Sequence, residues 1–160
     1  MAPIKRSEYL KPLSREHHYS LLFGWKLRQG ISHGISAARM VNYVRYFELH
    51  MLIPHFKEEE TCLFIYSDSS DVGQALDDHR HILALIATMK AQPENTRYSD
   101  LEALAALVDR HVRFEERQLF PYFEQNLTQA QLEAVAAKIK DGPAVADDYE
   151  DLFWEKAKNI

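Results

Sequence analysis

Histidine and glutamate recur in this sequence in a pattern that can hold metal ions. Residues 55–66 (HFKEEETCLFIY) and 111–122 (HVRFEERQLFPY) both fit His-x-x-x-Glu-Glu-x-x-Leu-Phe-x-Tyr. A histidine and a glutamate four residues apart lie on the same face of an α-helix, one turn from each other. Six shared residues in twelve indicate an internal repeat, and therefore a helical bundle with two similar halves.

The apolar residues around each histidine indicate which side chains face the interior. His111 and Glu115 continue an apolar stripe of helical period, and His55 and Glu59 do the same in the first repeat. His79 also lies on the apolar face of its segment. The expected inward-facing ligands are, in chain order, His18, His55, Glu59, His79, His111 and Glu115.

The positions of three histidines stay open. His17 and His18 are adjacent, and apolar residues three, four and seven positions after His18 favour it over His17 as the inward residue. His81 has a poorer apolar face than His79. We interpret His81 as a surface residue, with a role beside a metal ligand as the alternative.

Inward-facing carboxylates need a counter-charge, because burying an unpaired carboxylate costs several kcal/mol. No lysine or arginine lies on these stripes, whereas a bound cation satisfies carboxylates and neutral imidazoles together. Imidazole and carboxylate without thiolate suit iron, manganese or zinc. Six ligands are too many for one tetrahedral zinc ion, so two metal ions that share Glu59 and Glu115 are favoured.

This set of residues resembles the hemerythrin-like family of histidine-histidine-glutamate cation-binding domains. The resemblance covers about residues 14–125 and is carried by Arg15-Glu16-His17-His18, His55-x-x-x-Glu59-Glu60, Asp78-His79, His111-x-x-x-Glu115-Glu116 and Leu119-Phe120-Pro121. It implies a non-haem centre of two Fe ions with an oxo or hydroxo bridge. One ion would be bound mainly from the first two helices and the other from the last two. Ferritin-like bundles differ, since they use Glu-x-x-His.

The resemblance implies binding or sensing of O2, NO or a related small oxidant. The alternative is a di-iron redox or iron-delivery factor related to iron–sulfur cluster repair proteins, and a structural zinc bundle is a third possibility. Oxygen carriers of this family have a further histidine one turn after the counterpart of His79, where this chain has Leu83. We therefore expect four histidines, an open metal position, and oxidation by O2 instead of reversible oxygen carriage. Whether the chain is an enzyme stays open, and no catalytic residue is assigned.

The fold that must position these residues is predicted to be all-α, an up-down-up-down four-helix bundle with an additional C-terminal helix. Helical periodicity and breaks predict helices at about 15–28, 36–65, 72–91, 100–124 and 128–140, the first capped by Ser14. We expect one domain over 1–160, with a core bundle at about 14–125 and a C-terminal helical extension over 126–160.

Composition and charge indicate which classes of partner to expect. The formal charge is -5 with no basic stripe, so no nucleic-acid partner is expected. No run of 18 apolar residues occurs, so no membrane association is expected. One cysteine, Cys62, and the lack of a signal-peptide pattern favour a cytoplasmic location. A small diatomic ligand such as O2 or NO is the expected partner, and a sensing output would need an unidentified protein partner.

Overall fold

The structure, a computed structural model, describes residues 6–140 and 147–155. In these ranges the chain forms helices and no strand, which confirms the all-α prediction. Four long helical segments precede a shorter helix. They are α1 (Lys11–Ser32); α2 (Ala37–Phe47) with η1 (Glu48–Leu52), α3 (Ile53–Glu58), η2 (Glu59–Leu63) and η3 (Phe64–Tyr66); α4 (Ser70–Ala91); and α5 (Tyr98–Phe114) with η5 (Glu115–Leu119) and α6 (Phe120–Asn126). A short 3-10 turn, η4 (Pro93–Asn95), joins α4 to α5, and α7 (Gln129–Lys140) follows α6.

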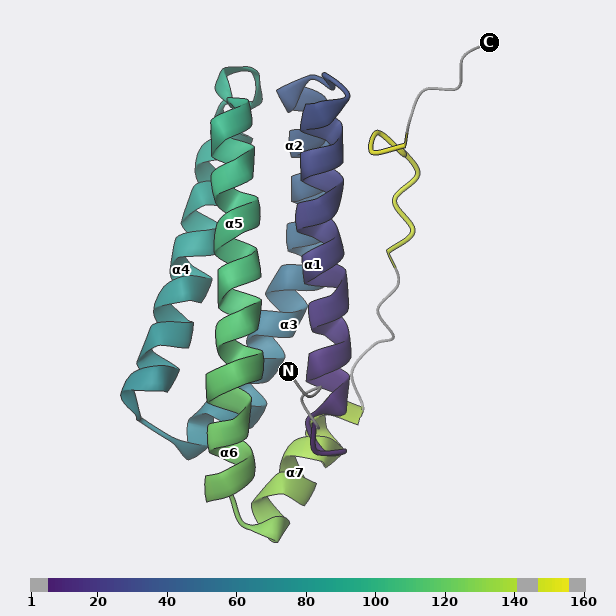
Figure 1. The fold of residues 1–160 in the computed structure, drawn as a ribbon. Coiled ribbons are helices and arrows are strands. Elements are labelled where there is room, and N and C mark those ends of the chain that lie inside the picture. Colours follow the sequence, from purple (N-terminus) through teal and green to yellow (C-terminus); the bar gives the residue numbers. More distant parts are fainter. Residues whose placement is uncertain (1–5, 141–146, 156–160) are drawn as a thin grey trace.

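The long segments lie side by side and surround a shared interior (Figure 1). α1 packs along α5, α4 packs on α5, and α2 packs on α4 and α1. Where α1 meets α5, Gly24 permits a close approach: a Cβ there would lie 3.1 Å from Asp109 Oδ1 and 3.6 Å from the Cβ of Ala105. Small residues therefore occupy part of the buried face of α1.

The observed start of the first helix differs from the predicted one, and this difference affects the site. α1 begins at Lys11, with Pro12 in its first turn, where a proline costs no backbone hydrogen bond. Ser14 is thus inside the helix and does not cap it. Its hydroxyl donates instead to Glu116 of η5, at 3.0 Å.

The interior consists of two apolar clusters with polar residues between them. The upper cluster, at the end of the bundle where α1 connects to α2, includes Phe23, Phe47, Phe56, Ile82, Ile86, Leu104 and Val112. The lower cluster includes Leu13, Leu63, Phe64, Ala75, Leu119, Phe120 and Phe123. Along each long segment, one or two buried histidines or glutamates separate the members of the two clusters. The clusters hold the segments together, and the polar layer between them is the candidate site.

The described C-terminal residues 147–155 are not helical, so the helical part of the predicted extension is α7, and 141–146 and 156–160 lie outside the described residues. Phe153 is buried against Tyr43, with ring centroids 5.4 Å apart. Lys26 of α1 contacts Asp147 at 2.6 Å and lies 3.9 Å from the ring centre of Trp154. This segment therefore covers α1 and α2 above the polar layer.

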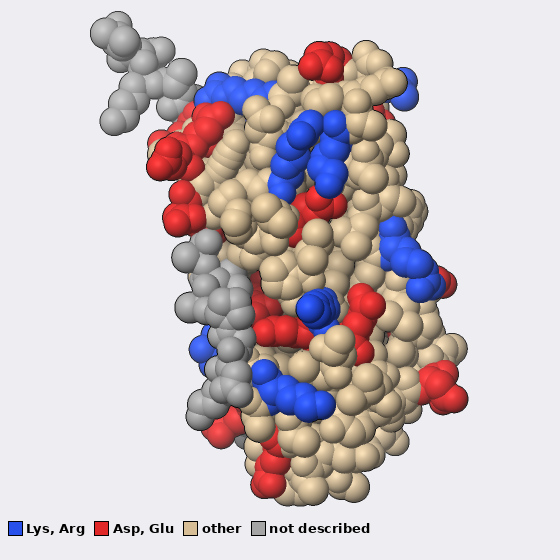
Figure 2. All heavy atoms as spheres, turned by 180° about the vertical axis from the view of Figure 1, so that it is seen from behind, with Lys and Arg blue, Asp and Glu red and all other residues tan. Residues whose placement is uncertain are grey.

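The surface is mixed in charge. On the face drawn in Figure 2, acidic and basic side chains are interspersed, with no extended basic area. None of the helices in 6–140 or 147–155 is both long and apolar enough to cross a membrane.

Candidate metal centre

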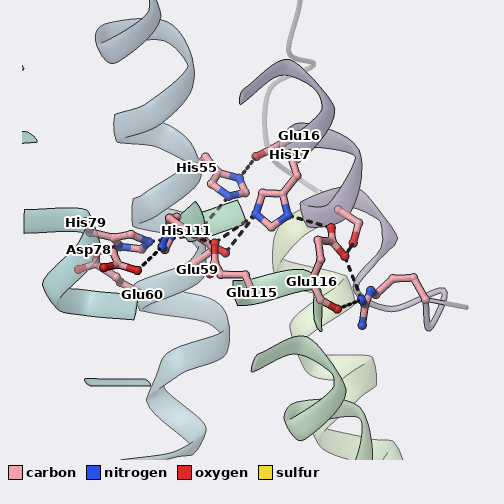
Figure 3. Close-up of polar contacts among 12 residues, drawn as sticks. Glu16, His17, His55, Glu59, Glu60, Asp78, His79, His111, Glu115 and Glu116 are labelled. Atoms are coloured by element: carbon pink, nitrogen blue, oxygen red, sulfur yellow. Dashed lines mark hydrogen bonds and ion pairs between the residues drawn. The ribbon is translucent and has the colours of Figure 1, made fainter. Parts of the chain in front are cut away.

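Four histidines and two glutamates meet in the polar layer between the two apolar clusters (Figure 3). They form two groups whose possible ligand atoms all lie within 4.8 Å of one another. The groups are His17, His55, Glu59 and Glu115, and Glu59, His79, His111 and Glu115. Every member is buried, and both glutamates belong to both groups.

The geometry repeats the symmetry of the sequence. His55 Nε2 lies 3.1 Å from Glu59 Oε1, and His111 Nε2 lies 2.8 Å from Glu115 Oε1, each pair on one helical segment. Across the interface, His79 Nε2 lies 3.3 Å from Glu59 Oε1. His17 Nε2 lies 3.2 Å from Glu115 Oε1. Each glutamate thus lies within 3.3 Å of one histidine of its own segment and one of a neighbouring segment.

The prediction that His18 faces the interior is wrong. His17 is buried in the site, whereas His18 is exposed. The apolar residues that favoured His18 lie on the outside of α1, since Leu21 is 40% exposed and Trp25 is 48% exposed. The inward face of α1 carries Leu13, Phe23 and Leu27 together with small residues such as Ser20.

The other predicted residues lie together, as the stripes indicated, and His81 is exposed away from them. Leu83, where oxygen carriers have a further histidine, is half-buried and packs against the upper cluster. Phe56 stacks on His79, with ring centroids 3.8 Å apart and planes 10° apart. Apolar side chains thus surround the imidazole of His79.

The outer nitrogen of each of the four histidines in the site is held by a carboxylate that the sequence reasoning did not assign to the site. The Nδ1 distances are 2.8 Å from His17 to Glu116, 2.5 Å from His55 to Glu16, 2.7 Å from His79 to Glu60 and 3.0 Å from His111 to Asp78. A carboxylate accepts, so each Nδ1 carries a proton and each Nε2 points inward. The signal was in the sequence: an acid precedes His17 and His79, and each repeat has a second glutamate.

The site fits a cation because its inner polar atoms lack hydrogen-bond partners. These buried atoms are Nε2 of His55, His79 and His111, both carboxylate oxygens of Glu59, and Oε2 of Glu115. Each unsatisfied buried group costs about 1–3 kcal/mol. In the described ion pairs, Glu59 and Glu115 contact histidines and no lysine or arginine. Bound cations would satisfy these atoms together.

In the absence of a cation, the pKa values of the buried groups decide which of them carry protons. Burial, together with the facing carboxylate of Glu115, raises the pKa of Glu59. Burial lowers the pKa of His79 to about 3. Burial alone would lower the pKa of His111, but Glu115 and Asp78 outweigh it and raise that pKa to about 10. The metal-free layer therefore holds protons where cations would compete for the same lone pairs.

Each shared glutamate also begins a widened turn of its helix. The N–H of Phe64 donates to the carbonyl of Glu59, and the N–H of Phe120 donates to that of Glu115, five residues back in both cases. Single π-turns of this kind are rare and frequently occur at functional sites. The two turns have the same register in the repeat, so the repeat extends to the backbone.

Comparison with known families agrees with this geometry. Residues 10–123 match the family model of the hemerythrin HHE cation-binding domain. The match covers more than half of the chain, so the chain belongs to this family, and the predicted resemblance is confirmed. Neither the curated proteins nor the solved structures compared with the chain give a match.

Proposed function

We propose that the chain is a non-haem di-iron protein that binds or senses O2, NO or a related small oxidant. One Fe ion would be bound by His17 and His55 and the other by His79 and His111. The observation that carries the proposal is that both four-residue groups contain the same two glutamates, Glu59 and Glu115. Carboxylates shared in this way, with an oxo or hydroxo group, suit a pair of ions better than a single ion.

The donor set favours iron over a structural zinc ion. Each group offers two imidazoles and two shared carboxylates, and no thiolate. A structural zinc site is tetrahedral and closed. Imidazole with carboxylate and open positions is typical of non-haem iron. We also interpret the packing as an up-down-up-down four-helix bundle with α7 as the additional helix.

The side chains of this protein fit a small ligand. Iron supplies electron transfer to, or direct binding of, a diatomic molecule. Four histidines, with Leu83 in place of a fifth, leave fewer nitrogen ligands than oxygen carriers have. Phe56 and Phe64 place aromatic rings beside His79, at 3.8 and 5.8 Å between centroids. These rings make the surroundings of His79 apolar.

The test is to expose the reduced, iron-loaded protein to O2 and then to purge it with argon. We expect a lasting change to the oxidised spectrum, because few protecting ligands surround the open position. NO added to the reduced protein should give a separate, stable spectrum. A spectrum that forms with O2 and reverts fully over repeated cycles would contradict the proposal and favour reversible oxygen carriage.

A further inference from the structure

The two halves of the site share their ligand pattern but differ in what holds their outer carboxylates. Arg6 Nη2 donates to Glu116 Oε2 at 2.9 Å and to the backbone carbonyl of Glu116 at 2.5 Å. The other nitrogen of Arg6, Nη1, donates to Glu124 of α6. The counterpart in the first repeat is Glu60, whose side chain is 41% exposed. In the described ion pairs Glu60 contacts only His79.

The backbone of η5 explains why an arginine is needed here. In an α-helix, the carbonyl of Glu116 would accept from the N–H of Phe120. In the widened turn, that N–H donates to Glu115 instead. The donor five residues after Glu116 would be Pro121, which has no N–H. The carbonyl of Glu116 is therefore left without a backbone donor, and Arg6 supplies one.

The first repeat does not lack a backbone donor for the same reason. The position of Pro121 is taken there by Ile65, which keeps its N–H. The proline is thus the sequence difference that accompanies the arginine contact. Arg6 itself lies before the residues that match the family, 10–123.

Arg6 is joined to His17 by two routes. The first is through the Glu116 carboxylate, which accepts from Arg6 at 2.9 Å and from His17 Nδ1 at 2.8 Å. The second is through Phe120, since the Arg6 guanidinium lies 5.4 Å from its ring centre. Phe120 stacks on His17 with centroids 5.3 Å apart and planes 14° apart. The side chain of Arg6 is only 6% exposed, so these contacts are shielded from solvent.

We propose that Arg6 is a positioning residue for one half of the centre. It fixes Glu116, and through Glu116 and Phe120 it sets the orientation of His17. The His17–His55 half then depends on the segment before α1, whereas the His79–His111 half does not. This inference rests on the proposed two-ion site. Contacts behind a metal-binding histidine typically change metal affinity about 10- to 100-fold when they are removed.

The test is an anaerobic competition titration of the full chain with Fe²⁺ against a coloured chelator. Arg6→Gln should weaken one of two binding steps by about 10-fold or more and leave the other unchanged. Arg39→Gln is the matched control. Arg39 also ties a terminal segment to a helix, through Asp151 at 2.8 Å, but it contacts no member of the site. It should change neither step.

A double-mutant cycle separates positioning from general destabilisation. Glu116→Gln should weaken the same step as Arg6→Gln, and the double variant should lose little more than Arg6→Gln alone, because both changes break the path through Glu116. Equal weakening of both steps, no change in Arg6→Gln, or additive losses in the double variant would overturn the inference.

A metal-free measurement keeps this test apart from that of the proposed function. In imidazole ¹⁵N–¹H spectra of the metal-free protein, Arg6→Gln should speed solvent exchange of the His17 Nδ1 proton and leave that of His79 unchanged. Unchanged exchange at His17 would overturn the inference whatever the metal content. A wild-type chain that takes up fewer than two ions, with the expected exchange result, would instead defeat the proposed function and keep the role of Arg6 in orienting His17.

Discussion

At the residue scale, each of the four histidines lies between carboxylates, with Nδ1 facing an outer acid and Nε2 facing the shared pair Glu59 and Glu115. The outer acids fix the rings and their tautomers, so the inner nitrogens are preorganised as ligands. This arrangement uses residues from all four long segments. Because adjacent residues of a helix point in different directions, a histidine one position away in the sequence would not reach the site.

The adjacent pair on α1 gives the sharpest mutational comparison. His17→Ala should lower the iron content of the purified protein, because it removes one of the two imidazoles of its group. His18→Ala should leave the iron content unchanged, because His18 is exposed. The measurement is iron per chain by elemental analysis. Equal iron in the two variants, or a loss only in His18→Ala, would contradict the assignment of His17.

The pKa shifts predict that metal binding releases protons at pH 7. In the metal-free protein the pKa of His111, raised to about 10, keeps that group protonated at pH 7, and the pKa of Glu59 is shifted in the same direction. Metal ligands must be deprotonated, so metal loading should release protons. Because binding releases protons, metal affinity should rise as the pH rises. Calorimetry in buffers of different ionisation enthalpy measures the released protons, and identical heats in all buffers would count against the shifts.

The sequence identified five of the six buried ligand candidates, because four-residue spacing on an apolar stripe fixes a helix face. It misplaced the sixth because the apolar residues that follow His18 outweighed Leu13, Phe23 and Leu27, which share the buried face of α1 with His17. That face also includes Gly24 and Gly30, where neighbouring elements approach closely.

At the element scale, helix periodicity predicted where the long segments lie, but not their widened turns. Apolar stripes carry no signal for such turns. Prolines were the available signal: Pro54 follows η1, and Pro121 follows η5. A proline removes one backbone donor and crowds the preceding turn. η2 has no such proline, so the turn at Glu59 was not predictable in this way.

The C-terminal segment gives a prediction for stability away from the site. Phe153→Ala should destabilise the fold by about 3–5 kcal/mol, because the ring is buried against Tyr43 and beside Gly30. The neighbouring control, Leu152→Ala, should change stability by less than about 0.5 kcal/mol, because Leu152 is 47% exposed.

Urea unfolding of the metal-free protein measures both effects. The iron content of the two variants should match that of the wild type, because Phe153 packs in the upper cluster and touches no ligand. Similar destabilisation in both variants would show that the described segment 147–155 does not pack as found here.

At the scale of the whole molecule, two apolar clusters hold four helical segments around a layer of buried, charged groups. That layer costs stability when its inner atoms lack partners, and the cost is recovered when cations bind. The fold is therefore arranged to be most stable when loaded. Family membership agrees with this, since the matching domain binds cations.

The most direct test of this account is the metal content of the protein purified from iron-replete cells, measured together with that of Glu115→Ala. We predict two Fe ions per wild-type chain. Glu115→Ala should lose most of both, because Glu115 belongs to both groups. A wild-type chain that holds a single zinc ion and no iron, or a Glu115→Ala variant that keeps its full iron content, would contradict the proposed shared centre.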